Sequence, residues 1–159
     1  ASSWDMQNYD RNESIKKLGE MIKSIKVAMM TTLDQEGGFH SRPMWTQHFE
    51  FDGDLWYFTR GDTSKAFELN RDSHVSLAFA DPEDGCYISV SGAGRVVRDQ
   101  EKAKQLWNPL YRAWFPKGLE DPELCLIQIR VQKAECWDSL SSELVQLLGF
   151  EHQKLDLAG

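Results

Sequence analysis

Short segments in which apolar and polar residues alternate, separated by tight turn sequences, make up most of this 159-residue chain. Alternation with a period of two is typical of strands that bury one face of a sheet. The turns include Asp34-Gln35-Glu36-Gly37-Gly38, Asp52-Gly53 and Asp81-Pro82-Glu83-Asp84-Gly85, rich in residues that favour turns. We predict strands over residues 27–33, 39–47, 49–51, 54–59, 74–80, 87–98, 124–131 and 134–138.

Helical patterns are few and lie between these strands. Residues 11–24 are predicted to form a helix capped by Asp10, because one apolar stripe recurs at helical spacing. A short helix is expected to run from a cap at Asp62 or Thr63 to residue 70. A third follows Asp99 and is split or kinked by Pro109. The stripe of the first helix comprises Ile15, Leu18, Ile22 and Ile25.

Strands joined directly by tight turns indicate a mainly β protein, a closed or half-closed antiparallel barrel. Gly92 and Gly94 predict a bend or bulge that curls the sheet. A Rossmann sheet is disfavoured, since no GxGxxG motif opens a helix after the first strand. We expect one domain over residues 1–159, with its core at 12–138 and a tail at 139–159. In the tail the spacing of Leu144, Leu147 and Leu148 predicts a helix.

Composition disfavours several classes of protein. The net charge is −7 and the basic residues are dispersed, which argues against a nucleic-acid partner. No window approaches the run of about 20 apolar residues that spans a bilayer, and no secretory signal pattern opens the chain, although a removed signal stays compatible with it. Three cysteines without a CxxC pair suggest reduced thiols and a cytoplasmic protein. The four histidines lack metal-ligand spacing, so we expect no metal site.

Two short motifs could bind a ligand. In residues 59–65 a strand ends, Gly61 turns the chain and a helix begins with Ser64 and Lys65, an arrangement that suits a phosphate; an ordinary capped helix with an exposed lysine explains the same pattern. In Arg42-Pro43-Met44 the proline interrupts a strand, so backbone groups and Arg42 could contact a planar ligand and its phosphate. A surface arginine on an edge strand is the alternative. Three tryptophans could wall a flat ligand or simply fill the core: Trp107, Trp114 and Trp137.

Together with further blocks in the same order, these motifs resemble the pyridoxamine 5′-phosphate oxidase-like FMN-binding split barrels, and within them the general stress protein branch. The resemblance runs from about Ile15 to Asp138, and no block is specific alone. The blocks are Arg42-Pro43-Met44, Leu55-Trp56-Tyr57-Phe58-Thr59, Ser64-Lys65, Val90-Ser91-Gly92-Ala93-Gly94, Leu106-Trp107-Asn108-Pro109, Trp114-Phe115-Pro116-Lys117-Gly118, Asp121-Pro122 and Ala134-Glu135-Cys136-Trp137-Asp138.

The resemblance implies a six-stranded antiparallel split barrel and a homodimer with FMN in clefts between the subunits. By analogy, the strand Arg42-Pro43-Met44 contacts the flavin ring and its tail. Phe58 and Thr59 lie along the cofactor, and Ser64 and Lys65 hold its phosphate. Trp137 approaches the flavin, either that of its own chain or that of the partner chain.

The chain departs from the oxidases themselves. They carry further basic residues after the phosphate serine and near the C-terminus. Here Ala66 and Phe67 follow Lys65, and Lys154 is the only lysine or arginine of the tail. This argues against pyridoxamine phosphate oxidase activity. Two hypotheses remain: an FMN-dependent oxidoreductase, reduced by NAD(P)H or another donor, and a flavin store or sensor without turnover. A third keeps the barrel but replaces FMN by the deazaflavin F420 or haem. No catalytic side chain, substrate or redox potential follows from these residues.

Overall fold

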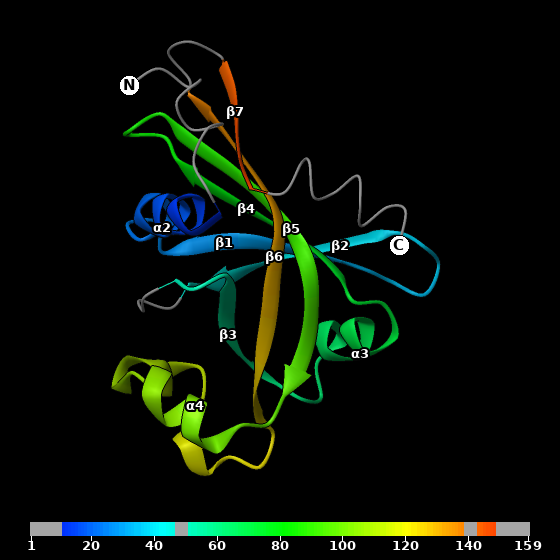
Figure 1. Ribbon diagram of the computed structural model, residues 1–159. Helices are drawn as coiled ribbons and strands as arrows, with labels where there is room; N and C mark the ends of the chain where they lie inside the picture. Colours follow the sequence, from blue (N-terminus) through cyan, green and yellow to red (C-terminus); the bar gives the residue numbers. More distant parts are fainter. Residues whose placement is uncertain (1–10, 47–50, 139–142, 149–159) are drawn as a thin grey trace.

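The chain folds into a curled antiparallel sheet with short helices at its edges (Figure 1). The computed structural model describes residues 11–46, 51–138 and 143–148. The helices are α2 (Arg11–Ile22), α3 (Ser64–Arg71), α4 (Gln100–Leu106) and the 3₁₀ helices η1 (Pro109–Ala113) and η2 (Gly118–Glu120). The strands are β1 (Val27–Leu33), β2 (Phe39–Trp45), β3 (Asp54–Arg60), β4 (His74–Asp81), β5 (Cys86–Val97), β6 (Leu124–Asp138) and β7 (Glu143–Leu148).

The strand order β2-β1-β4-β5-β6-β3 makes the six-stranded half-barrel, the split-barrel architecture predicted from the sequence. Every pairing is antiparallel. β5 and β6 are the longest strands and curve together through the middle of the molecule (Figure 1). Their register shifts between Ser91 and Gly92, where a Cβ on Gly92 would lie 2.1 Å from the carbonyl oxygen of Arg130. The predicted bulge is therefore confirmed at Gly92, where only glycine lets the two backbones approach so closely.

Alternation along the strands separates a buried inner face from an outer one. In β4 and β5 every second side chain is buried, and α2 closes one end of the barrel with Leu18 and Ile22, at most 4% exposed. A second, smaller cluster joins the lower part of the sheet to α4 and η1. Its buried members are Trp56, Phe58, Ala103, Tyr111, Leu124 and Leu126.

Most helix boundaries follow the predicted signals. Asp99 caps α4 by accepting a hydrogen bond from the Lys102 backbone N–H at 3.0 Å, and Pro109 begins η1, so the predicted split occurs there. Thr63 occupies the cap position of α3, but its side chain makes no capping bond. The Asp10 cap predicted for α2 lies outside the described residues. Within the described ranges, no helix is long and apolar enough to cross a membrane.

Two predictions need correction: the helix in the tail, and the strand over residues 49–51 that was expected to form a hairpin with β3. The expected helix over the tail leucines is wrong, because residues 143–148 form β7 and pair with residues 134–138 of β6. β3 pairs only with the first half of β6, so the second half presents open backbone groups that a strand can satisfy. The expected hairpin partner of β3 is also wrong: β3 pairs with β6, Phe51 lies in no strand, and residues 47–50 lie outside the described residues.

Candidate functional site

A cleft of about 390 Å³ opens where β2 and β3 end, beside the start of α3 and the η1 segment. It joins parts of the chain that are far apart in sequence, because the curled sheet brings β2 and β3 to the same side. Five of the eight predicted site residues line it: Pro43, Met44, Phe58, Thr59 and Lys65. The other lining residues are Val27, Trp45, Arg60, Thr63, Tyr111, Trp114 and Phe115.

Aromatic side chains form one end of the cleft. Trp45 and Trp114 lie with their ring centroids 5.7 Å apart, and 41% and 56% of their surfaces are exposed. Phe58 lies behind them, buried against Trp107 and Tyr111 at centroid distances of 5.5 and 5.6 Å. The Trp114 backbone N–H donates to the carbonyl oxygen of the buried Tyr111 at 3.0 Å, which anchors the chain at Trp114. Open aromatic faces on a fixed base suit a flat ligand that stacks against them.

The opposite end of the cleft is the first turn of α3. Thr63, at the cap position, donates its hydroxyl hydrogen bond to the Arg60 carbonyl oxygen at 2.8 Å instead of accepting from the helix. The first N–H groups of α3 are therefore left without a side-chain cap from Thr63. Such groups carry a partial positive charge that attracts anions. Ser64 is the first residue of this helix.

Lys65 is half-buried at this end and makes no hydrogen bond or ion pair with any residue that the structure describes. Burial lowers the pKa of its ammonium group, and the nearby positive charge of Arg42 lowers it further. An anionic ligand would stabilise the charged form of this lysine, because it offsets both the loss of hydration and the repulsion from Arg42.

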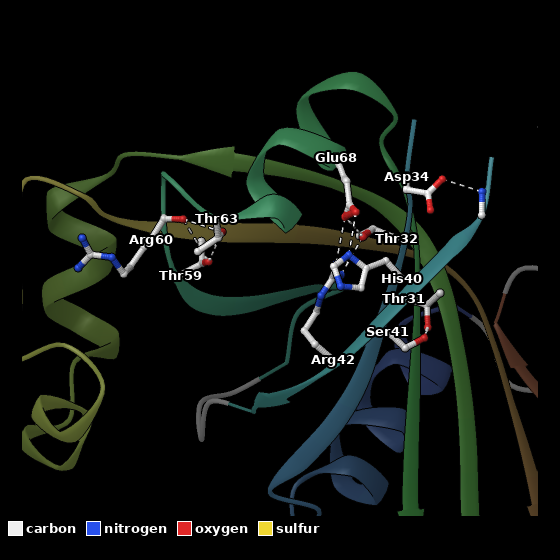
Figure 2. A network of polar contacts seen from close by, with 11 residues as sticks. Thr31, Thr32, Asp34, His40, Ser41, Arg42, Thr59, Arg60, Thr63 and Glu68 are labelled. Atoms are coloured by element: carbon white, nitrogen blue, oxygen red, sulfur yellow. Dashed lines mark hydrogen bonds and ion pairs between the residues drawn. The ribbon is translucent and has the colours of Figure 1, made fainter. Parts of the chain in front are cut away.

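Arg42 does not line the cleft, contrary to the simplest form of the sequence hypothesis. Its guanidinium donates one hydrogen bond to the Thr32 hydroxyl at 2.7 Å and another to Glu68 at 3.0 Å. Thr32 in turn donates to the same Glu68 oxygen at 2.9 Å, and His40 lies 2.9 Å from the other carboxylate oxygen. Figure 2 shows these four side chains converging from β1, β2 and α3.

Glu68 was not identified from the sequence. It is 8% exposed on the inward side of α3, near the buried Ala66 and Leu69. Burial pushes the pKa of its carboxyl group upward, but hydrogen bonds from His40, Thr32 and Arg42 outweigh burial and leave the pKa below its usual value. The carboxylate is therefore ionised at neutral pH. The one available sequence signal was an acidic residue in helical register with apolar positions.

Arg60 forms the rim of the cleft beside Lys65. Its guanidinium pairs with Asp121 at 3.0 Å and with Asp62 at 3.3 Å. Asp121 is buried, and the backbone N–H of Glu123, followed by the charge of Arg60, holds the pKa of that carboxyl below its usual value. The charge of Arg60 is thus already balanced by two carboxylates.

Trp137 lies away from this cleft. It sits on β6 opposite Tyr87 of β5 and is 38% exposed. Strand alternation places it on the same outer face of the sheet as Met29 of β1, since both follow the register through β4 and β5. The structure therefore does not bring Trp137 to the cleft of its own chain. No group of three or more metal-ligating side chains was found among the described residues.

Comparison with known proteins identifies the family. The family model described as "Pyridoxamine 5′-phosphate oxidase like" matches residues 13–157. The chain belongs to the pyridoxamine 5′-phosphate oxidase-like family. The membership predicted from the ordered motifs is thus confirmed, and several similar solved structures are general stress proteins.

Relatives of this pyridoxamine 5′-phosphate oxidase-like chain come from fungi and bacteria. Protein bli-3 of Neurospora crassa is 31% identical over 133 residues, which cover 77% of this chain and 64% of that protein. The general stress FMN/FAD binding protein of the phytopathogen Xanthomonas citri is 30% identical, with a TM-score of 0.68 over 80% of this chain and 89% of its own. A Clostridium acetobutylicum protein related to general stress protein 26 of B. subtilis has a TM-score of 0.73 at 16% identity, covering 90% and 99% of the two chains. This last likeness concerns the fold alone.

Proposed function

We propose that this protein binds FMN in the cleft between β2, β3, α3 and η1. The observation that carries the proposal is an open aromatic wall at one end and, at the other, a half-buried lysine without a partner among the described residues. The isoalloxazine ring fits against Trp114 and the strand Pro43-Met44-Trp45. The phosphate fits at Lys65 and the first turn of α3, with Ser64 beside it. The Xanthomonas citri relative, an FMN/FAD binding protein, supports a flavin.

The charges around Lys65 favour the single phosphate of FMN over the diphosphate of FAD. Lys65 is one cation, and the neighbouring Arg60 is already paired with Asp62 and Asp121. A second phosphate in this direction would meet those carboxylates, and like charges held close together repel. We infer that FMN is the preferred flavin and that FAD binds more weakly.

We also propose that two copies of the chain form a dimer that completes the cleft. Val27 and Met29 of β1 and Trp45 of β2 are each more than 40% exposed, and they lie on one outer face because Val27 pairs with Trp45. Trp137 lies on the same face of the sheet. A contiguous apolar face of this kind is typical of an interface. In a dimer, Trp137 is free to approach the flavin of the partner chain.

FMN would supply the redox chemistry, since its ring accepts and returns electrons. The described residues that line the cleft include no histidine, carboxylate or thiol, so we propose that the chain's own residues bind, orient and shield the ring. We propose an FMN-dependent oxidoreductase reduced by NAD(P)H or another donor. The lack of histidine, carboxylate and thiol groups among these lining residues also suits the second candidate, a flavin store or sensor without turnover. The structure places none of the three cysteines in a disulfide, and we propose a cytoplasmic location, where thiols stay reduced.

The first test is a titration of the purified protein with FMN, followed by visible absorbance and flavin fluorescence. We expect perturbed flavin bands near roughly 375 and 450 nm and quenched fluorescence. No change at saturating FMN would overturn the cofactor assignment. Anaerobic addition of NADH or NADPH then tests for turnover with these donors: rapid bleaching of the 450 nm band supports the oxidoreductase, whereas slow reduction leaves a store or an enzyme that uses another donor.

A further inference from the structure

We propose that Glu68 is a positioning residue that fixes Lys65 against the strand bearing Arg42-Pro43-Met44, and so sets the affinity for the phosphate of the ligand. This inference rests on the proposed function and adds to it a residue that does not touch the cleft. Glu68 is absent from the cleft lining. Its effect on the ligand therefore has to pass through the residues that it holds.

The contacts of Glu68 tie three elements together at one point. Both carboxylate oxygens are used: Oε1 by His40 of β2, and Oε2 by Thr32 of β1 and Arg42 of β2. Arg42 also bonds Thr32, so a closed triangle of hydrogen bonds connects the arginine, the hydroxyl and the carboxylate. Figure 2 shows α3 held over the two strands by this group. Hydrogen bonds that involve charged groups in a buried setting are short and directional, so they restrain position.

The position of Glu68 on α3 transmits this restraint to Lys65. Glu68 follows Lys65 by three residues, about one helical turn, and therefore lies on the same side of the helix. The strand on the other side of the network continues from Arg42 directly into Pro43 and Met44, which line the cleft. Glu68 thus sets the distance between the start of α3, which would bind the phosphate, and β2, which would contact the ring.

Glu68 also balances the positive charge of Arg42, with which it forms an ion pair. The carboxylate neutralises the guanidinium, whose charge lowers the pKa of Lys65. Because Glu68 and Arg42 cancel, Lys65 remains as the net positive charge facing the cleft from this side. A variant that removed the carboxylate charge would mix an electrostatic effect with a positional one, so the test needs variants that leave the charge unchanged.

Two such variants are available. Glu68→Asp keeps the charge but shortens the side chain by one methylene, so it cannot hold all three partners. Thr32→Val removes one donor and one acceptor from the network at a site that is 1% exposed and changes no charge. We expect each to weaken FMN binding by about tenfold, the range of coupling between contacting residues. Riboflavin, which has the same ring without the phosphate, should bind within about twofold of wild type, because its affinity does not depend on Lys65.

Matched controls and a double-mutant cycle complete the experiment. Asp72→Glu changes a carboxylate by one methylene at the other end of α3, where Asp72 contacts exposed His74 at 2.7 Å. Thr46→Val removes a buried hydroxyl that lies 3.4 Å from the Tyr57 hydroxyl. Neither control should change FMN or riboflavin affinity. In a chain that already carries Lys65→Met, Glu68→Asp should weaken FMN binding by no more than about twofold further, since the phosphate contact is gone.

The outcomes separate this inference from the proposed function. If wild-type protein binds neither FMN nor riboflavin, the proposed function fails. If wild-type protein binds FMN but Glu68→Asp and Thr32→Val leave its affinity unchanged, or weaken FMN and riboflavin equally, the positioning role is overturned. Full additivity of Glu68→Asp and Lys65→Met would also overturn it. Thermal unfolding of each variant identifies a general loss of structure, which would appear as equal losses for both flavins.

Discussion

The two ends of the cleft are built in opposite ways. At the α3 end the polar groups are buried and bonded to one another through Thr32, Arg42 and Glu68, and Lys65 alone is left without a protein partner among the described residues. At the η1 end, Trp45 and Trp114 are exposed, and their ring centroids lie 5.7 Å apart. The charged end is thus completed within one chain, whereas the aromatic end still exposes apolar surface. For the proposed FMN site, this difference implies that the phosphate end is complete in one protomer, whereas the ring end depends on what covers the tryptophans.

The largest expected effect is a loss of stability when a buried ring is removed from the aromatic end of the cleft. Phe58→Ala removes a ring that is 7% exposed and contacts Trp107, Tyr111 and Phe115. We expect a loss of about 3–5 kcal/mol in the free energy of unfolding, from lost burial and the cavity left behind. Urea unfolding followed by tryptophan fluorescence measures it. Phe39→Ala is the matched control, since Phe39 is 81% exposed and its loss should change stability little.

The next effect isolates the charged end. Lys65→Met keeps the length of the side chain but removes its charge, and should weaken FMN binding by about 1–3 kcal/mol if a charge-assisted contact with phosphate is lost. Riboflavin affinity should stay the same. Isothermal titration with both flavins checks this. Lys104→Met, which removes an exposed lysine that pairs with Glu101 at 3.8 Å, serves as the control. Equal losses for the two flavins would mean that Lys65 does not hold the phosphate.

A smaller effect tests the ring end directly. Trp114→Ala should weaken FMN and riboflavin alike, by about 0.5–1.5 kcal/mol, the range of a single aromatic contact. Leu110→Ala is the control: Leu110 lies in η1, just before Trp114, is 76% exposed and is absent from the cleft lining. It should leave both affinities unchanged. Fluorescence quenching gives both constants, and a loss confined to FMN would contradict the assignment of ring and phosphate to opposite ends.

The smallest effect is a pH dependence at the charged end. The pKa of Lys65 is lowered in the folded protein, so between that value and the ordinary lysine pKa of about 10.4 the unfolded chain binds more protons. The ligand-free protein should therefore gain stability as the pH rises through this window, while FMN affinity falls because the ammonium charge is lost. Comparing wild type with Lys65→Met by thermal unfolding at each pH isolates the contribution of Lys65. A difference that does not change between pH 7 and 10 would contradict the lowered pKa.

Much of the fold followed from local patterns. Alternation and turn residues predicted β1 to β6, although not the absence of a strand at Phe51, and Asp99 and Pro109 marked helix boundaries that the structure confirms. The tail failed because three leucines at helical spacing describe only local preference. Residues 143–148 instead meet the open edge of β6 beyond the end of β3, and that edge exists only once the sheet has formed.

In the candidate site, too, local features could be predicted from the sequence, whereas contacts between distant segments could not. Local sequence was enough to predict that a glycine turn precedes α3 and that Pro43 lies in an edge strand, β2, because both depend on neighbouring residues in the chain. Local sequence did not predict that Arg42 bonds Glu68 and Thr32, across 26 and 10 residues, or that the rings of Trp114 and Trp45 lie side by side at a tilt of 36°. Those partners were decided by the curvature of the sheet, which brings β1, β2, α3 and η1 together. A buried charge must find its partner in three dimensions, and periodicity along the chain does not specify which one it finds.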